Sequence, residues 1–189
     1  MPEGDYQKKR YEELKNGQVG SMLNVIGVDQ IRALQKIAVE ETRLGIPLIF
    51  GHDVIHGYKT IFPIPLAESC SWDLELMQKS ARVAATEASA DGLHWTFAPM
   101  VDISRDARWG RVMEGAGEDP FLGSLVAQAR VSGFQGENLS DTNTIIGCAK
   151  HFAGYGFSEA GRDYNAADFN EYTLHNSIMP PFKAAVDAG

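Results

Sequence analysis

The stretch "TIIGCAKHFAGYG", residues 144–156, decides how this chain is interpreted. It begins with the apolar and small residues of a buried strand and ends in Lys150 and His151, followed by Gly154 and Gly156. Adjacent strand residues normally point to opposite faces of a sheet. Lys150 and His151 therefore face one pocket only if the backbone leaves regular strand geometry, which the glycines permit. One functional residue beside one buried partner fits the spacing equally well.

Strand-like and helix-like segments alternate along the whole chain. Short apolar runs predict strands, and 3.6-residue periodicity with capping residues predicts helices. Pro180 and Pro181 must break or restart the last of these helices. The strands are expected at residues 18–27, 46–53, 95–104 and 144–152, and the helices at residues 29–45, 73–92, 120–136 and 171–189. This order predicts a parallel sheet covered by helices, either open and doubly wound or closed into a (β/α)8 barrel. No G-x-G-x-x-G fingerprint follows the first strand, which favours the barrel.

The predicted fold class is α/β, a partial TIM-like (β/α)8 barrel of about four β/α units, that is, a half barrel. A closed barrel usually takes about 250 residues, whereas this chain has 189. Residues 1–17 form a polar N-terminal segment, and residues 18–189 form the first part of the barrel domain. We expect the chain to be truncated, because its last residues stop where a helix would lead into the next strand.

Composition excludes several classes of partner. The formal net charge of -8 argues against nucleic acid, which requires clustered basic residues. No apolar run reaches the roughly 18 residues that a membrane span needs. The N-terminus lacks the apolar core of a signal peptide, so either the protein is cytoplasmic or its true start is missing. Cys70 and Cys148 form no C-x-x-C pair and are expected to be inert core thiols.

Polar residues collect directly after three successive predicted strands, in "GHDVIHG", "DISRDARWGRVMEGAGEDP" and "KHFAGYG". In parallel α/β folds, the carboxyl ends of the strands meet at one edge and carry the functional residues. Each stretch alone is a weak signal, but their shared position predicts a site at this edge.

Asp53 and Arg111 are the strongest candidates in the first two stretches. An ionised Asp53 can accept hydrogen bonds from two neighbouring sugar hydroxyls, although a loop-bracing or helix-capping role is equally compatible with its position. Arg111 offers directional donors to hydroxyls or a carboxylate. Its alternative role is a structural salt bridge to Glu118 or Asp119.

The other charged residues of the second stretch are expected to be structural. Arg105 and Arg108 have Asp106 as their natural partner. Trp109 is either a stacking platform or, as is more common, a buried residue that braces the loop.

The spacing of His52 and His56 resembles the H-E-x-x-H motif of zinc proteases. That motif needs a helix to bring both imidazoles to one face. Here Gly51 and Gly57 bracket the pair directly after a strand, so no metal site is predicted. His94 and His175 carry no readable signal and are expected at the surface or in packing.

The long motifs together resemble glycoside hydrolase family three, most closely its bacterial periplasmic β-glucosidase branch. The matching stretches are "IPLIFGHDVIHGYKTIFPIPLAESCSWD", "APMVDISRDARWGRVMEGAGEDP", "KHFAGYG" and "MPPFKAAVDAG". The resemblance implies a TIM-like barrel followed by an α/β sandwich domain, with the active site between them. It implies that Asp53, Arg111, Lys150 and His151 bind the hydroxyls of a terminal glucose, and that the Lys-His pair sits on an irregular strand exit.

The chemistry that the resemblance implies is retaining hydrolysis, which uses two carboxyl groups about 5–5.5 Å apart. The family's nucleophile is an Asp in a Ser-Asp-Trp or Ser-Asp-His context, and its usual acid/base is a Glu of the second domain. Neither the Asp motif nor the Glu of a second domain occurs in this sequence, so no catalytic residue is assigned. Both catalytic residues are expected beyond Gly189, and the isolated chain is expected to be inactive. Tyr155 stands where the N-acetylglucosaminidase branch has its acid/base His, which favours a glucosidase.

The expected function is therefore part of an exo-acting β-glucosidase with a small carbohydrate substrate and no cofactor. Its partner would be the missing remainder of the same chain, and the full-length protein would be periplasmic or extracellular. Two alternatives stay open. One is a related exo-glycosidase, such as a β-xylosidase or an exo-glucanase. The other is a non-catalytic sugar-binding half barrel, whose open sheet edges would promote association or aggregation.

Overall fold

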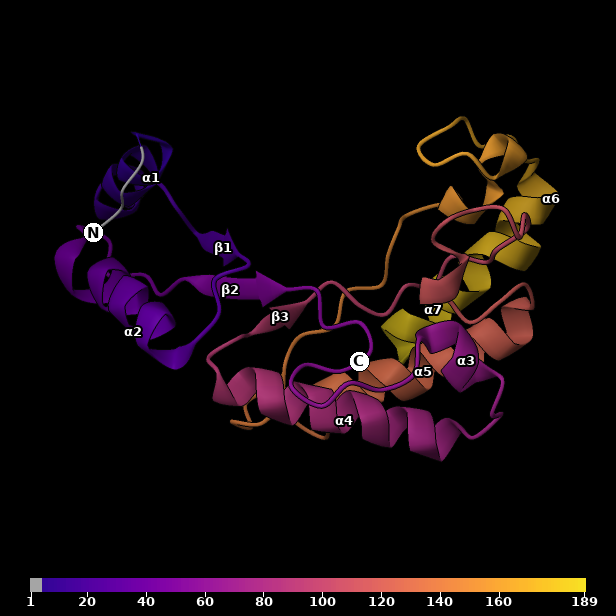
Figure 1. The fold of residues 1–189 in the computed structure, drawn as a ribbon, viewed down its shortest axis with the longest axis horizontal. Coiled ribbons are helices and arrows are strands. Elements are labelled where there is room, and N and C mark those ends of the chain that lie inside the picture. The colour runs from indigo at the N-terminus through magenta and orange to yellow at the C-terminus, as the bar shows by residue number, and fades with distance from the viewer. Residues whose placement is uncertain (1–4) are drawn as a thin grey trace.

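Short parallel strands form the sheet in the computed structural model, which describes residues 5–189 (Figure 1). They are β1 (Ser21–Leu23), β2 (Ile49–His52) and β3 (Trp95–Thr96), in the order β1-β2-β3. β1 pairs with β2 and β2 with β3, both in parallel. The parallel sheet expected from the alternating sequence is therefore present, and its first strands lie inside the predicted ranges.

The predicted fourth strand, residues 144–152, lies beside β3 but forms only isolated bridges. The N–H of Thr96 donates to the carbonyl of Ile146 at 2.9 Å, and the N–H of Val101 donates to the carbonyl of Lys150 at 2.8 Å. The segment thus runs parallel to its neighbour as expected. The prediction of a regular strand is wrong.

The predicted third strand, residues 95–104, is regular only across β3. Pro99 follows a cis peptide bond and has no N–H to donate, so it cannot continue the ladder of hydrogen bonds. The backbone beyond it is buried but irregular. This irregular stretch leads into the loop that carries Arg111.

The four predicted helical regions are present. Their bounds are α2 (Val28–Lys36) with the π-helical turn η1 (Ile37–Glu41), α4 (Leu74–Ala90), α5 (Pro120–Gln135), and α6 (Glu171–Thr173), η5 (Leu174–Ile178) and α7 (Met179–Asp187) in succession. The last region restarts next to Pro180, as predicted. Further elements were not predicted: α1 (Asp5–Lys15), α3 (Pro65–Ser69) and the short 3-10 turns η2 (Val112–Glu114), η3 (Tyr155–Phe157) and η4 (Glu159–Gly161).

Side-chain caps fix where the two longest helices begin. The carboxylate of Asp73 accepts the N–H of Leu76 at 2.9 Å, as its predicted N-cap role requires. Asp119 accepts the N–H groups of Phe121 and Leu122 at 3.0 and 3.3 Å and so caps α5. Both caps lie at the same edge as the strand exits, because each helix runs back along the sheet.

The core lies between the sheet and the long helices. α4 and α5 pack side by side, α7 packs against α5, and α1 and α2 lie at the opposite end from α6 (Figure 1). Phe50 and Phe134 are buried in the cluster beneath the sheet, and Val131 and Phe182 pack between α5 and α7. A Cβ on Gly133 would meet the backbone of α4 at 2.5 Å, so glycine allows the two helices to approach closely.

One ion pair is buried inside this frame. Arg130 of α5 donates to Glu68 of α3 at 2.6 Å, and their side chains are only 5% and 9% exposed. Arg130 also donates to the carbonyl of Ile55, two residues after Asp53. The pair therefore joins α5, α3 and the loop that follows β2.

The prediction that both cysteines are core thiols is wrong for Cys70. Cys70 is exposed, and Cys148 is half-buried. Cys70 caps the end of the short helix α3, whose inward face is formed instead by Pro65 and Ser69. Apolar neighbours in sequence do not reveal which face of so short a helix is buried.

Glu87 of α4 holds the loop that follows β2, and it makes the stability of the protein depend on pH. Its carboxylate accepts the N–H groups of Lys59 and Thr60 at 2.8 Å each and the hydroxyl of Thr60 at 2.6 Å. These hydrogen bonds, first that of the Thr60 hydroxyl, lower the pKa of Glu87 from its ordinary value of 4.5. The stabilisation is therefore present above 4.5 and is lost as the pH falls through the folded-state pKa.

We expect Glu87→Gln to lower the melting temperature at neutral pH and to melt like the parent protein in acid. Thermal denaturation from neutral pH to well below 4.5 measures this difference. Glu75→Gln, which removes one exposed ion pair with Lys79 on the same helix, is the matched control and should change little at any pH. A gap between Glu87→Gln and the parent that persists unchanged in acid would contradict the assignment.

Candidate functional site

The exits of β2 and of the segment after residue 144 meet at one edge, as the parallel topology requires. The ammonium of Lys150 donates to the Oδ1 of Asp53 at 3.0 Å. The side chain of Lys150 is 12% exposed and that of Asp53 is 48% exposed. The pair thus presents its carboxylate, rather than its ammonium, to solvent.

His151 contacts a different carboxylate from its neighbour Lys150. Its Nδ1 lies 2.8 Å from the Oδ2 of Asp102, and its backbone N–H donates to the same oxygen at 2.8 Å. The peptide bond between Lys150 and His151 is cis. This segment forms only isolated bridges, so its backbone departs from regular strand geometry. The side chains of both residues keep some exposure, 12% and 32% respectively, so neither is buried away from the edge.

Arg111 forms a two-pronged ion pair with Glu114. Its Nε and Nη2 donate to the two carboxylate oxygens at 2.7 Å each. The prediction that Arg111 pairs with Glu118 or Asp119 is wrong. The 3-10 turn η2 brings residues three apart onto one side, so Glu114 lies beside Arg111, and Asp119 caps α5. This ion pair raises the pKa of Arg111, and Arg111 holds the pKa of Glu114 below its usual range.

The charges of Lys150 and His151 also lower the pKa of Glu114, although less than Arg111 does. Arg111 and His151 also both lie against the ring of Tyr155, at 5.6 and 4.9 Å from its centroid. Together with the contact between Lys150 and Asp53, this brings all four predicted residues into one site.

Tyr155 lies at the centre of the site. Its ring is 4.9 Å from the ring of His151 and 5.0 Å from that of Trp109, and the guanidinium of Arg111 lies 5.6 Å from the ring centroid. Its hydroxyl donates to Asp163. Burial, followed by this hydrogen bond, raises the pKa of Tyr155 to about 12, so the phenol stays protonated at neutral pH. The ring of Tyr155 is a packing surface for the imidazole of His151 and the guanidinium of Arg111.

The remaining residues of the second stretch are structural, largely as predicted. Trp109 is 1% exposed and braces the loop. Arg108 pairs with Asp106, with Nε 2.9 Å from Oδ1. Arg105 instead donates to the hydroxyl of Ser177 at 3.3 Å, so Asp106 is not its partner.

The two histidines with zinc-protease spacing have separate partners. The Nδ1 of His52 lies 2.8 Å from the side-chain oxygen of Asn24, and the Nδ1 of His56 lies 2.8 Å from the carbonyl of Phe62. Within residues 5–189, no group of three His, Cys, Asp or Glu side chains is placed to hold a metal ion. Nor does that part of the chain contain a helix long and apolar enough to cross a membrane.

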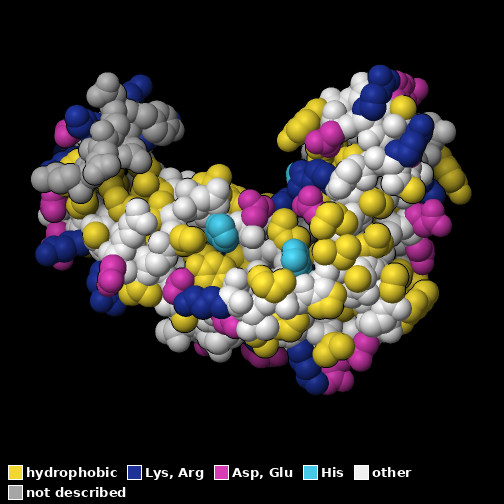
Figure 2. All heavy atoms as spheres, in the orientation of Figure 1, with side chains coloured by type: hydrophobic (Ala, Val, Ile, Leu, Met, Phe, Trp, Pro, Cys, Tyr) yellow, Lys and Arg dark blue, Asp and Glu magenta, His cyan; other side chains and the backbone are white. Residues whose placement is uncertain are grey.

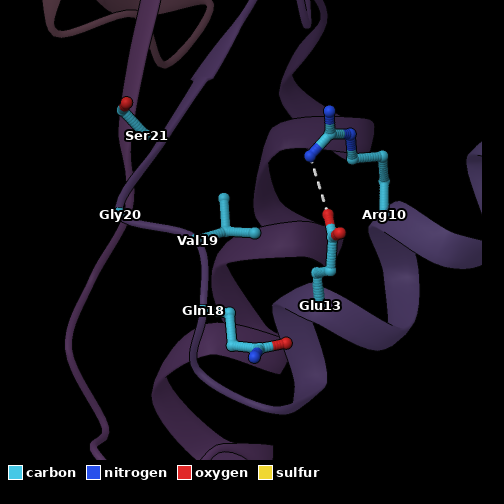
Figure 3. A pocket seen from close by; sticks show the side chains of 6 residues that line it. All are labelled: Arg10, Glu13, Gln18, Val19, Gly20 and Ser21. Carbon is cyan, nitrogen blue, oxygen red and sulfur yellow. Dashed lines mark hydrogen bonds and ion pairs between the residues drawn. The ribbon is translucent and has the colours of Figure 1, made fainter.

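The surface is hollowed between the end that carries α1 and the end that carries α6, and acidic, basic and histidine side chains gather on the floor of the hollow (Figure 2). A separate pocket of about 400 Å³ lies where α1 meets β1 (Figure 3). It contains an ion pair of 2.7 Å and none of the predicted site residues; it is lined by Arg10, Glu13, Gln18, Val19, Gly20 and Ser21.

Three carboxylates that contact residues of the site were not predicted: Asp102, Glu114 and Asp163. One signal was available for Asp102, since a carboxylate inside the apolar run "APMVDIS" must be buried and needs a partner. Nothing in the spacing of the sequence points to His151 as that partner.

Comparison with known proteins identifies the family. The "Glycosyl hydrolase family 3 N terminal domain" matches residues 1–189. The chain belongs to glycosyl hydrolase family 3. The resemblance read from the long motifs is therefore confirmed. So is the α/β class with parallel strands, because the fold matches the N-terminal domains of this family's solved structures.

The chain is 45% identical over 178 residues to a periplasmic beta-glucosidase of Salmonella typhimurium, covering 94% of this chain and 23% of that protein. It is 34% identical to a beta-xylosidase of Formosa agariphila, covering 95% of this chain and 27% of that protein. The crystal structure of a beta-glucosidase from Listeria innocua in complex with glucose superposes with a TM-score of 0.91 at 44% identity, covering 100% of this chain and 27% of that chain. This family 3 chain thus spans about a quarter of the length of these relatives.

Proposed function

We propose that the chain is the first part of the barrel domain of a retaining, exo-acting β-glucosidase and forms one wall of its glucose subsite. The observation that carries the proposal is the convergence of Asp53, Arg111, Lys150 and His151 at one edge of the sheet. The relatives named above include beta-glucosidases, one of them crystallised with glucose, and support the choice of sugar.

The four side chains divide the work of holding a sugar. Asp53 keeps an exposed carboxylate that accepts hydrogen bonds from two adjacent hydroxyls, while Lys150 fixes its position. His151 and Arg111 contribute further polar groups against the ring of Tyr155. Charged groups of both signs around a polyhydroxylated ring give directional binding, because each hydroxyl donates one hydrogen bond and accepts others.

The two catalytic carboxyl groups belong to the remainder of a longer protein. In this proposal residues 18–189 supply a half barrel of about four β/α units, preceded by the N-terminal segment at residues 1–17. A later barrel strand supplies the nucleophile, and a second domain supplies the acid/base. The full-length protein acts in the periplasm or outside the cell, as the name of the relative from Salmonella indicates for that protein.

A β-xylosidase is the second candidate, favoured by the relative from Formosa agariphila. Both sugars present similar hydroxyls at carbons 2 to 4, and xylose lacks the hydroxymethyl group at carbon 5. Discrimination therefore depends on the space around carbon 5, and measured rates on the two glycosides decide between the candidates.

The test compares the complete protein with residues 1–189 alone on aryl β-glucoside and aryl β-xyloside. We expect hydrolysis by the complete protein, faster on the glucoside, and none by the shorter chain. His151→Ala in the complete protein should lower kcat/KM at least about 10-fold, since a charge-assisted hydrogen bond is worth about 1.5–3 kcal/mol. Hydrolysis by folded residues 1–189 that disappears in Asp53→Ala or His151→Ala would contradict the proposal.

A further inference from the structure

We propose that Asp102 is a positioning residue that fixes the tautomer and orientation of His151, so that the sugar meets Nε2 of the imidazole. This inference rests on the proposed function only for the identity of the ligand. The contact between Asp102 and His151, on which the inference depends, is present without any ligand.

The contact is unusually complete for two side chains that lie 49 residues apart. A single oxygen of Asp102, Oδ2, accepts the backbone N–H of His151 at 2.8 Å and lies 2.8 Å from its Nδ1. The side chain of Asp102 is 1% exposed, whereas that of His151 is 32% exposed. The buried end of the contact therefore belongs to the carboxylate, and the exposed part of the imidazole lies on the other side of the ring.

The chemistry of the carboxylate and the imidazole determines which ring nitrogen of His151 carries the proton. An ionised carboxylate only accepts hydrogen bonds, so the Nδ1 that faces it must carry a hydrogen. In the neutral imidazole Nε2 is then an acceptor for a sugar hydroxyl, and in the charged imidazolium it becomes a donor. Tyr155 packs edge-on against the ring at 86° and blocks rotation from a second side.

Asp102 has no other evident task in the described part of the chain. Its second oxygen, Oδ1, is buried without a hydrogen-bond partner there. A buried carboxylate with one unbonded oxygen costs stability, so its presence in a core segment argues for a role that an apolar residue could not fill. Orienting His151 is that role, because both of its hydrogen bonds go to this residue.

The test uses Asp102→Asn in the complete protein. The asparagine amide has the same shape, but it can donate an N–H to Nδ1, which shifts the neutral ring to the Nε2-protonated tautomer. Nitrogen NMR of ¹⁵N-histidine-labelled protein, with His151 identified through His151→Gln, reads the tautomer directly. Isothermal titration with glucose reads the functional effect.

We expect a protonated Nδ1 in the parent protein, an altered tautomer in Asp102→Asn and a loss of glucose affinity of about 10-fold, the size of one changed hydrogen bond. Asp106→Asn changes a half-buried carboxylate of the same loop, which pairs with Arg108, and should alter neither the tautomer of His151 nor the glucose affinity. An unprotonated Nδ1 in the parent protein overturns the inference, even if the variant fails to fold. So does a folded Asp102→Asn with an unchanged tautomer.

The two proposals fail in distinguishable ways. Unchanged glucose affinity in His151→Ala defeats the proposed function and leaves the assignment of the tautomer standing. A large loss in His151→Ala, combined with unchanged affinity in a folded Asp102→Asn, supports the sugar site and overturns the positioning role of Asp102.

Discussion

Asp53→Ala in the complete protein is expected to weaken glucose binding about 100- to 1,000-fold without unfolding the protein. Two charge-assisted hydrogen bonds to sugar hydroxyls contribute about 1.5–3 kcal/mol each, and the lower part of their sum gives this factor. The substitution also leaves Lys150, whose side chain is only 12% exposed, without its carboxylate partner. Isothermal titration with glucose measures the change, and circular dichroism checks the fold.

Asp106→Ala is the matched control for this prediction. It removes a half-buried carboxylate from the loop after β3, and the partner of that carboxylate is the exposed Arg108 rather than a candidate site residue. We expect glucose affinity within about 2-fold of the parent, since exposed ion pairs contribute little. Equal losses of affinity in Asp53→Ala and Asp106→Ala would show that net charge, rather than a built site, controls binding.

The second large effect concerns stability. Removing Arg130 leaves Glu68, whose side chain is 9% exposed, as an uncompensated buried charge and the carbonyl of Ile55 without its donor. Breaking a buried ion pair in this way costs about 3–5 kcal/mol. For a chain of this size, Arg130→Ala should lower the melting temperature by about 10 °C.

Two further variants separate the buried charge from simple loss of packing. Arg108→Ala breaks an exposed ion pair and should change the free energy of unfolding by less than about 0.5 kcal/mol. Glu68→Leu combined with Arg130→Met replaces both charges with apolar groups and should regain most of the lost stability. If the double variant is as unstable as Arg130→Ala, the cost comes from shape and from the lost bond to Ile55, not from the unpaired carboxylate.

Local sequence signals predicted the four long helical regions. Asp73 and Pro120 mark helix starts through capping and fixed backbone geometry, which depend on a few neighbouring residues. Parallel strands all end at one edge, so a shared position of Asp53 and Lys150, 97 residues apart, was expected from topology, whereas their direct contact was not predicted. That these residues bind glucose stays a prediction.

What the sequence did not predict depends on contacts between distant segments. The third and fourth strands are irregular because their hydrogen bonds depend on the partner backbone, not on the apolar run itself. The spacing of residues in the sequence did not indicate that Asp102 contacts His151. Glu118 or Asp119 was expected as the partner of Arg111 instead of Glu114, because a short 3-10 turn leaves no periodic signal in the sequence. Cys70 was misplaced for the same reason, since the exposed face of α3 is set by tertiary packing.

The crystal structure of the complete protein with bound glucose tests the central claim most directly. The account predicts one glucose at the edge formed by the strand exits, with its hydroxyls within hydrogen-bond distance of Asp53, Lys150, His151 and Arg111. Glucose bound at full occupancy elsewhere, with these four side chains in contact only with one another, would contradict it.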